Sequence, residues 1–294
     1  MSYKCGHVAI VGQPNVGKST LLNTLVGAPL AIVTPKPQTT RHRIVGLLNR
    51  DDAQIIFVDT PGFHKPKKTL NTLMVEIVDQ VIPDVDVACL VIAPKLPLSP
   101  LDQHLFDRIG ADRCIVVINK GDLVDQKNSD AIARATHEQW GAKEAVVISA
   151  LHGLNVHLLV KTIQERLPQG PALYPTDTYT SHPTRFLASE MIREQVFLQM
   201  GDEIPYQTTV DIESFQDATE EDPITRIEAS VFVEKESQKA MVVGKGGRRI
   251  KEVGTRARHK LEELVGGKVF LKLTVRVDEE WSQNPTKLRD YGYL

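Results

Sequence analysis

The chain has few cysteines and lacks any long hydrophobic run. Its 294 residues include only three cysteines, Cys5, Cys89 and Cys114, and their spacing matches neither a disulfide framework nor a zinc site. No apolar run approaches the roughly 18 residues that cross a bilayer, and the N-terminal residues lack the basic and apolar regions of a secretory signal. We therefore expect a cytoplasmic protein with reduced thiols.

Neither sign of charge is in excess, and aromatic residues make up only 5% of the chain. The 35 basic and 37 acidic residues give a formal net charge of −2, so overall charge neither supports nor excludes a nucleic-acid partner. Repeats and low-complexity tracts are also missing. The length is sufficient for two domains, and a hydrophobic fraction of 41% is ordinary for a folded protein with a sizeable core.

The most specific pattern in the chain is the segment Gly12-Gln13-Pro14-Asn15-Val16-Gly17-Lys18-Ser19, which matches the phosphate-binding motif G-x-x-x-x-G-K-[ST]. An apolar run over 7–11 precedes it and a helical pattern over 20–26 follows, as the motif requires. Backbone N–H groups and the helix N-terminus would hold a polyphosphate, Lys18 would reach its β- and γ-phosphates, and the Ser19 hydroxyl would bind Mg²⁺. The candidate phosphate contacts are Asn15, Val16, Gly17, Lys18, Ser19 and Thr20.

Further polar motifs follow apolar runs that are typical of sheet strands. Runs over 44–48 and 55–58 predict two strands joined by a turn, and runs over 85–93, 114–118 and 145–148 predict parallel strands covered on both faces. The motifs at their ends are Asp59-Thr60-Pro61-Gly62, Asn119-Lys120-Gly121-Asp122 and Ser149-Ala150-Leu151. Each is a common polar turn by itself, but in a parallel sheet all of them converge on one edge. There Asp59 can hold magnesium, and Gly62 can offer its N–H to the terminal phosphate.

These motifs, in this order, resemble the small GTPases of translation over roughly residues 6–168. The resemblance implies a Ras-like P-loop fold in which Asp122 reads guanine, Asn119 and Lys120 fix and flank the base, and the Ser149-Ala150-Leu151 segment contacts it. It also implies that Thr40, or alternatively Thr39, closes on magnesium together with Ser19 and Asp59. Lys18, Thr40 and Gly62 are then the catalytic candidates. GTP is favoured over ATP, since adenine would leave the Asp122 carboxylate unpaired.

One position departs from the Ras pattern. Phe63 follows Gly62, where a glutamine would orient the attacking water. Because a phenyl ring cannot polarise water, we expect slow intrinsic hydrolysis, with water positioned by other groups or by a partner. An equally simple interpretation is that Phe63 is a packing residue.

The composition changes after a helical pattern over 156–163. Residues 169–182 are rich in proline and poor in apolar residues, so we predict a first domain at 1–168, a linker at 169–182 and a second domain at 183–294. The second domain is predicted to contain a helix at 185–199, strands at 206–215 and 225–234, a helix after Gly247 and a strand at 269–277. The acidic run at 217–222 is expected to be a solvated hairpin loop.

A basic segment lies within the second domain. Residues 239–260 contain eight lysines and arginines against one acid, Glu252. This segment includes a G-x-x-G loop, which in KH domains clamps about four nucleotides of single-stranded RNA. By itself such a loop is more often a helix-cap turn, but the neighbouring elements and the basic cluster favour RNA binding. The candidate RNA contacts are Gly244, Lys245, Gly246, Gly247, Arg248 and Arg249; Ile250 and Val253 are expected in the core.

The order helix-strand-strand-helix-helix-strand resembles the α+β fold of a type II KH domain. A GTPase domain followed by a KH domain, with Pro37-Gln38-Thr39-Thr40-Arg41 in the switch loop, closely resembles the Era family of bacterial GTPases. The resemblance implies binding to the 3′ end of small-subunit ribosomal RNA, assistance in 30S subunit assembly and peripheral association with the inner membrane. Nothing in the sequence requires more than a monomer.

We expect a switch mechanism in which GTP and Mg²⁺ order residues 32–42 and 59–68, and the second domain responds to those loops. Two alternatives remain open at this stage. The first is an RNA-binding assembly factor that senses nucleotide with negligible turnover. The second is an ATP-dependent RNA remodeller, which Asn119-Lys120-Gly121-Asp122 and the lack of a second motor domain disfavour.

Overall fold

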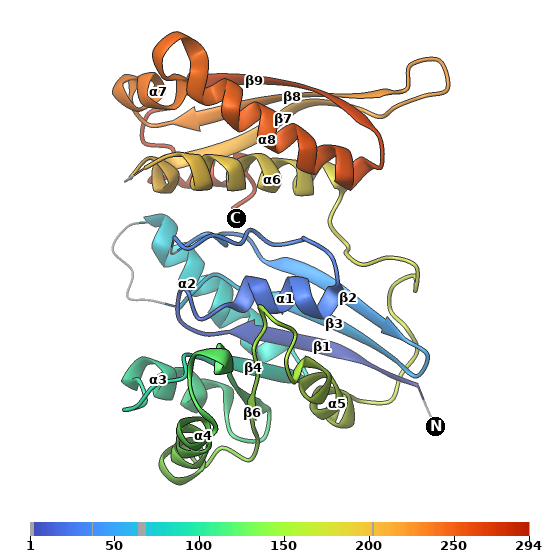
Figure 1. Cartoon of the computed structure of the whole chain (residues 1–294), viewed down its shortest axis with the longest axis vertical. Coiled ribbons are helices and arrows are strands. Elements are labelled where there is room, and N and C mark those ends of the chain that lie inside the picture. The colour runs from blue at the N-terminus through green and yellow to red at the C-terminus, as the bar shows by residue number, and fades with distance from the viewer. Residues whose placement is uncertain (1–2, 37, 64–68, 202, 294) are drawn as a thin grey trace. The chain divides into compact units, whose positions relative to one another are not determined.

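The computed structural model describes residues 3–36, 38–63, 69–201 and 203–293. The chain folds into two compact units, and the boundary along the chain lies between Ser181 and His182 (Figure 1). Each unit has its own sheet, with six strands in the first unit and three in the second. Residues 169–181, which the sequence predicts to be part of a linker, belong to the first unit.

The first unit alternates strands and helices. In chain order it contains β1 (Lys4–Val11), α1 (Lys18–Val26), β2 (Ile44–Arg50), β3 (Ala53–Asp59), α2 (Thr69–Val81), β4 (Val87–Ile92), α3 (Pro100–Ile109), β5 (Cys114–Ile118), α4 (Gln126–Trp140), β6 (Ala145–Val147) and α5 (Val156–Arg166). The strand order is β2-β3-β1-β4-β5-β6, and only the β2–β3 pair is antiparallel. The predicted Ras-like sheet is confirmed.

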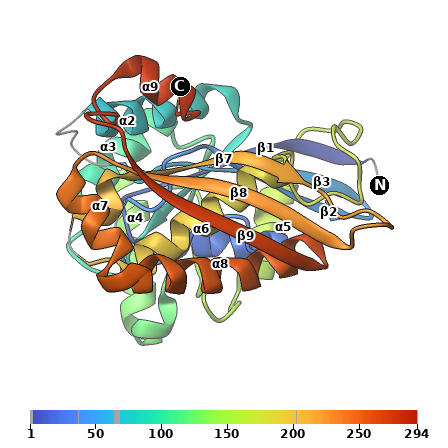
Figure 2. The same ribbon diagram turned by 90° about the horizontal axis from the view of Figure 1, so that it is seen from above.

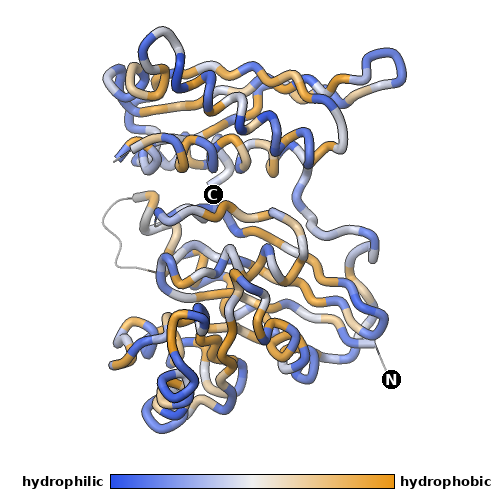
Figure 3. The backbone as a smooth tube through the Cα atoms, in the orientation of Figure 1, coloured by the Kyte–Doolittle hydropathy of each residue, from blue (hydrophilic) through white to orange (hydrophobic). Residues whose placement is uncertain are grey.

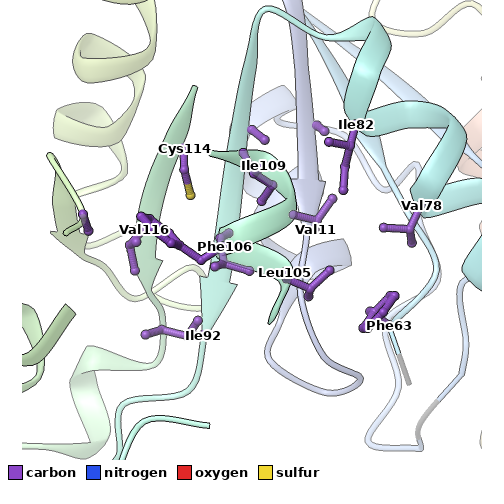
Figure 4. Close-up of a cluster of buried hydrophobic side chains, with 14 of the residues drawn as sticks. Val11, Phe63, Val78, Ile82, Ile92, Leu105, Phe106, Ile109, Cys114 and Val116 are labelled. Carbon is purple, nitrogen blue, oxygen red and sulfur yellow. The ribbon is translucent and has the colours of Figure 1, made fainter. Parts of the chain in front are cut away.

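The central strands form the core of this unit because helices cover the sheet. β3, β4 and β5 are buried along their whole length, and the hydropathy colouring shows the strands as apolar stretches between polar helix faces (Figure 3). One cluster of buried side chains joins Val11, Val78 and Leu105 to Phe63 (Figure 4). Phe63 is 6% exposed, so its side chain is a packing residue in this structure.

The second unit packs two long helices on one face of a three-stranded sheet. It contains α6 (Thr184–Gln199), β7 (Thr208–Gln216), β8 (Ile224–Val233), α7 (Glu236–Val243), α8 (Arg248–Val265), β9 (Lys268–Val277) and α9 (Pro285–Asp290). β8 is the central strand, antiparallel to β7 and parallel to β9, and Figure 2 shows the three strands side by side. This is the predicted type II KH order. β7 begins at Thr208, because Ile204–Gln207 forms a 3-10 turn.

The C-terminal segment adds an element that sequence patterns do not indicate. Helix α9 has six residues, too few to produce a periodic signal. Trp281, which precedes it, is 0% exposed and donates its indole N–H to the Gln207 carbonyl at 3.2 Å. Its ring also contacts Tyr291 and Tyr293, with centroid distances of 5.8 and 5.7 Å. The aromatic residues of the last segment are therefore part of the core of the second unit.

Candidate functional site

The phosphate-binding loop lies where the first-domain motifs converge. A cavity of ≈380 Å³ is lined by this loop, the start of α1, residues 32–35 and 38–40, Gly62 and Lys120. Of the predicted contacts, the lining includes Asn15, Gly17, Lys18, Ser19, Thr20, Thr40, Gly62 and Lys120. The segment before β2 thus contributes lining residues, such as Ile32, Val33 and Thr34, that the sequence motifs do not single out. Pro37 and residues 64–68 of the expected switch segments lie outside the described residues.

Lys18 is held inside the loop. Its ammonium donates to the Gly12 carbonyl at 3.1 Å and to the Gln13 carbonyl at 2.9 Å. Burial lowers the pKa of Lys18 to about 8, while the nearby carboxylates of Asp59 and Asp102 act in the opposite direction. An anion in the cavity would stabilise the ammonium further, because it supplies the countercharge that the buried site lacks.

Three side chains whose oxygen atoms could bind a metal ion form a cluster at the end of β3. The Ser19 hydroxyl donates to Asp59 Oδ2 at 2.8 Å, and the Thr40 hydroxyl lies 2.7 Å from Ser19 Oγ and 3.4 Å from Asp59 Oδ2. Asp59 is 0% exposed, and its Oδ1 has no hydrogen-bond partner among the described residues. Burial raises the pKa of Asp59 to about 6, despite the opposing charge of Lys18.

These oxygen atoms fit a magnesium ion. Magnesium prefers oxygen ligands and needs only one or two carboxylates when phosphate and water complete its coordination shell. The orphaned Oδ1 of Asp59 supports this assignment, because a buried acceptor without a partner is costly unless a ligand satisfies it. Thr40 rather than Thr39 has its hydroxyl in the cluster. This agrees with the expectation from the family resemblance, which gives Thr40 first and Thr39 as the alternative.

Asn119 braces two loops against each other. Its Nδ2 donates to the Val16 carbonyl at 2.8 Å, and its Oδ1 accepts from the Ala150 N–H at 2.9 Å. Asn119 is 2% exposed, and a Cβ on Gly17 would lie 2.3 Å from its Nδ2, so the loop needs glycine at that position. Asn119 therefore ties the phosphate-binding loop to the Ser149-Ala150 segment. Lys120 lines the cavity and donates to the Asn15 carbonyl at 2.7 Å.

Asp122 lies beside the third motif. A hydrogen bond from the Ser149 side chain, and to a lesser extent the charges of His152 and Lys120, keep its pKa below the ordinary value. The carboxylate is thus ionised at neutral pH and can accept two N–H groups of a guanine edge. Ser149 and Ala150 are each 1% exposed, while Leu151 is 75% exposed. The first two are buried parts of the loop, and the Leu151 side chain is turned to solvent.

Gly62 brings the segment after β3 against the phosphate loop. A Cβ at this position would lie 2.9 Å from the Pro14 Cα, so a larger residue would push the two segments apart. The next N–H, that of Phe63, donates to the Gly12 carbonyl at 3.0 Å. The Phe63 side chain is not among the residues that line the cavity. It therefore offers no contact to a water molecule there.

The second unit places its G-x-x-G loop between α7 and α8. Gly246 and Gly247 have φ values of 59° and 76°, a region that favours glycine. Four of the eight basic residues in the segment 239–260 are paired: Lys239 with Glu236, Arg256 with Glu252, Arg258 with Glu262, and Lys260 with Glu194. Within the described part of the chain, Lys245, Arg248 and Lys251 form no ion pair, and Arg249 donates to the Met241 carbonyl. The uncompensated charge is thus concentrated at the loop.

A groove of ≈260 Å³ runs beside this loop, between α8 and the edge strand β9. Its lining residues are Ile250, Lys251, Gly254, Thr255, Arg258, Leu271 and Leu273. The floor is apolar and the rim is basic, a combination that suits unstacked bases and their phosphates. Val253 is 0% exposed, as expected for a core residue, while Ile250 is half-buried and also lines the groove. The sequence analysis did not identify Leu271 and Leu273 as groove residues. Their position beside α8 depends on the pairing of β9 with β8, which places β9 at the edge of the sheet.

Comparisons with known proteins identify both domains. Residues 7–120 match the family described as 50S ribosome-binding GTPase, and residues 203–282 match the KH domain family. GTPase Era of Syntrophus aciditrophicus is 41% identical, over 99% of this chain and 95% of that protein. GTPase Era of Staphylococcus haemolyticus is 39% identical, over 99% of this chain and 98% of the relative.

Two crystal structures are similar over nearly their whole length. One is a tyrosine-to-alanine variant of Aquifex aeolicus Era bound to GDP and AlF4⁻, with a TM-score of 0.94, 40% identity and 99% coverage of both chains. The other is Era in complex with MgGDPNP and nucleotides 1506–1542 of 16S ribosomal RNA, with the same score, identity and coverage. Full-length similarity at about 40% identity, together with both domain matches, shows that the chain belongs to the GTPase Era family.

Proposed function

We propose that this chain binds GTP with Mg²⁺, hydrolyses the GTP slowly, and binds the 3′ end of small-subunit ribosomal RNA to assist maturation and assembly of the 30S subunit. The observation that carries the nucleotide part is the cluster of Ser19, Thr40 and Asp59, in which Ser19 and Thr40 line the same cavity as Lys18 and Asp59 lies buried behind them. The RNA part is supported by the unpaired cations at the G-x-x-G loop. Related Era structures hold MgGDPNP with a 16S RNA fragment, and GDP with AlF4⁻.

The residues of the first domain divide the work of phosphoryl transfer. Lys18 and the loop amides would stabilise negative charge on the β- and γ-phosphates, and Gly62 would offer its N–H near the terminal phosphate. Ser19, Thr40 and Asp59 would hold Mg²⁺, which supplies charge neutralisation between the phosphates. Asp59 must be ionised to do this, so with its pKa raised to about 6 the metal would be held less well as the pH falls through that value. No covalent intermediate is needed.

Slow turnover follows from Phe63. Its ring is buried in the core cluster and cannot polarise a water molecule (Figure 4). The attacking water would therefore be oriented by backbone groups, by the loop containing Thr40, or by a partner. A phosphate-release assay separates this proposal from a nucleotide sensor with negligible turnover, and competition of ATP against GTP separates it from an ATP-dependent remodeller.

The decisive experiment measures affinity for a short single-stranded RNA of the ribosomal 3′ end, at stated salt, with GTP analogue, with GDP and without nucleotide. The variant is Gly246→Asp, and Gly246→Asn is its uncharged isostere. A Cβ at Gly246 would meet no atom within 4 Å, and asparagine and aspartate both tolerate positive φ, so each variant should fold. We expect aspartate to abolish RNA binding and asparagine to retain most of it. Unchanged binding by Gly246→Asp would disprove RNA binding through the G-x-x-G loop.

Three further points are part of the proposal, and only the last of them comes from the family resemblance. They are a cytoplasmic location, a monomeric state and peripheral association with the inner membrane. Membrane association can be tested by flotation with vesicles of defined lipid composition. Among the described residues, no helix is both long and apolar enough to span a bilayer.

A further inference from the structure

The segment that leads to the second unit is bound to the first unit along its length. We call residues 169–181 the strap. At its start, Gln169 forms an antiparallel bridge with Lys4, and the Gly170 N–H donates to the Tyr3 carbonyl at 3.1 Å. Proline-rich composition predicts a spacer, but these backbone pairs attach the segment to the sheet.

Gln54 is the main anchor of the strap. This residue of β3 is 0% exposed. Its Oε1 accepts from the N–H groups of Leu173 and Tyr174 at 2.8 and 3.0 Å, and its Nε2 donates to the Tyr174 carbonyl at 2.8 Å. A buried amide whose acceptor and donor both bind one backbone segment orders that segment, since undocking would leave the amide without these partners.

The second half of the strap follows the outer edge of β2, the edge strand of the sheet. Three hydrogen bonds connect them: Asn49 Nδ2 to the Thr178 carbonyl at 2.8 Å, the Leu47 N–H to the Tyr179 carbonyl at 2.9 Å, and the Thr180 hydroxyl to the Val45 carbonyl at 2.6 Å. The bonded positions on β2 move from Asn49 towards its first residue, Ile44. The strap therefore ends beside the part of β2 that continues from the loop containing Thr40.

The β2–β3 hairpin thus connects two functional regions. At one end, β2 begins just after the Thr40 loop and β3 ends at Asp59, and both residues belong to the proposed magnesium cluster. Gln54 and Asn49 on the same hairpin bind the strap. A shift of β2 when Thr40 closes on the metal would act directly on the Thr180–Val45 bond, and the second unit begins two residues later, at His182.

We propose that the strap is the relay between nucleotide and RNA: the nucleotide state changes its bonding to the β2 edge, and this changes the RNA affinity of the second domain. This inference rests on the proposed function, because it assumes that both ligands bind. It goes further by assigning the coupling to Gln54 and to the outer edge of β2. It also predicts that the sequence of the strap matters, and not only its length.

The test uses the full-length protein and two conservative variants. Thr180→Val removes one hydroxyl at nearly constant volume. Asn49→Ala removes the donor to the Thr178 carbonyl and also the acceptor of Gln54 Nε2, so both of its effects fall on the strap and its anchor. Thr176→Val is the matched control, because Thr176 is exposed and lies in the same strap. For each protein, the dissociation constant of the 3′-end RNA is measured with GTP analogue and with GDP, together with the affinity for each nucleotide. Amide hydrogen exchange at Leu173 and Tyr174 reports whether the strap is docked.

We expect the ratio of the RNA dissociation constant with GTP analogue to that with GDP to move towards one in Thr180→Val and Asn49→Ala. The change in this ratio should be about threefold or more. One net hydrogen bond corresponds to about a fivefold change in an equilibrium constant. Nucleotide affinities and the Thr176→Val ratio should remain at the parent values. If the parent ratio differs from one and both variants keep it, the relay is refuted while the proposed function stands. A parent that binds both ligands with a ratio of one refutes coupling altogether, and a parent that fails to bind either ligand refutes the proposed function itself.

Discussion

Replacing Asn119 by alanine tests the interpretation that its side chain is a brace beneath the nucleotide site. The change removes two hydrogen bonds, of 2.8 Å to the Val16 carbonyl and 2.9 Å from the Ala150 N–H. Both partners are in buried residues, Val16 at 5% and Ala150 at 1% exposure. The variant therefore leaves one acceptor and one donor without a protein partner.

Each buried polar group left unpaired costs about 1–3 kcal/mol. Because water from the neighbouring cavity can reach part of the gap, we take the lower part of the summed range, about 2–4 kcal/mol. This loss can appear in either of two measurements. If the loops stay ordered without ligand, stability falls; if they loosen, guanine-nucleotide affinity falls instead, by roughly 30- to 1,000-fold for the full amount.

The assay is therefore a pair of measurements on the same sample: urea unfolding of the nucleotide-free protein, and titration with a fluorescent GDP. The sum of the two free-energy losses should reach about 2–4 kcal/mol. Asn128→Ala is the control, since Asn128 is an exposed asparagine on α4 and should change neither quantity. A folded Asn119→Ala protein with parental stability and GDP affinity within about threefold of the parent would refute the brace.

Three other variants test separate parts of the structure. Asp102→Asn should stabilise the nucleotide-free protein more at pH 7 than at pH 4. Burial raises the pKa of Asp102, so folding disfavours the ionised carboxylate. This free-energy cost of folding is fully present above the raised pKa and disappears as the pH falls below the ordinary pKa of an aspartate. Equal gains at both pH values in urea unfolding would contradict that account. Trp281→Ala should lower the unfolding free energy of the second domain by about 3–5 kcal/mol, measured by calorimetry, because a fully buried indole and its hydrogen bond are lost. Lys18→Met should weaken GTP binding by about 100-fold or more in a filter-binding assay, since charge-assisted bonds to phosphate disappear; parental affinity would show that the ammonium does not reach the nucleotide.

The motifs that follow the strands were predictable because they depend on local spacing. A glycine-rich turn between strand and helix, and acidic or amide residues at the ends of apolar runs, are arranged by the parallel sheet itself. The same holds for the second domain, where apolar periodicity and glycine positions indicate the KH order. The backbone conformation at these motifs and turns depends mainly on a few residues that are neighbours in the sequence.

Other features depend on contacts between residues distant in sequence. The family resemblance gives Thr40 with Thr39 as an alternative, but only the folded loop brings the Thr40 hydroxyl to Ser19 and Asp59. Likewise, eight basic residues look alike in the sequence, but ion pairing on α7 and α8 leaves the unpaired ones around the G-x-x-G loop.

The strap and the C-terminal segment show the same limit. A proline-rich composition predicts a spacer, and neither it nor the polar residue Gln54 signals that the two bind each other across more than a hundred residues. Trp281 becomes a core residue only because the surface around Gln207 and two tyrosines accepts its ring. The sequence alone located the phosphate-binding and G-x-x-G loops, since these follow from local backbone geometry, and the resemblance of its motifs to known families gave the two domain types. Tertiary structure decided which threonine hydroxyl lies beside Asp59, which cations near the G-x-x-G loop lack an ion pair among the described residues, and which sheet edge binds the strap, because pairing and burial depend on partners that only folding brings together.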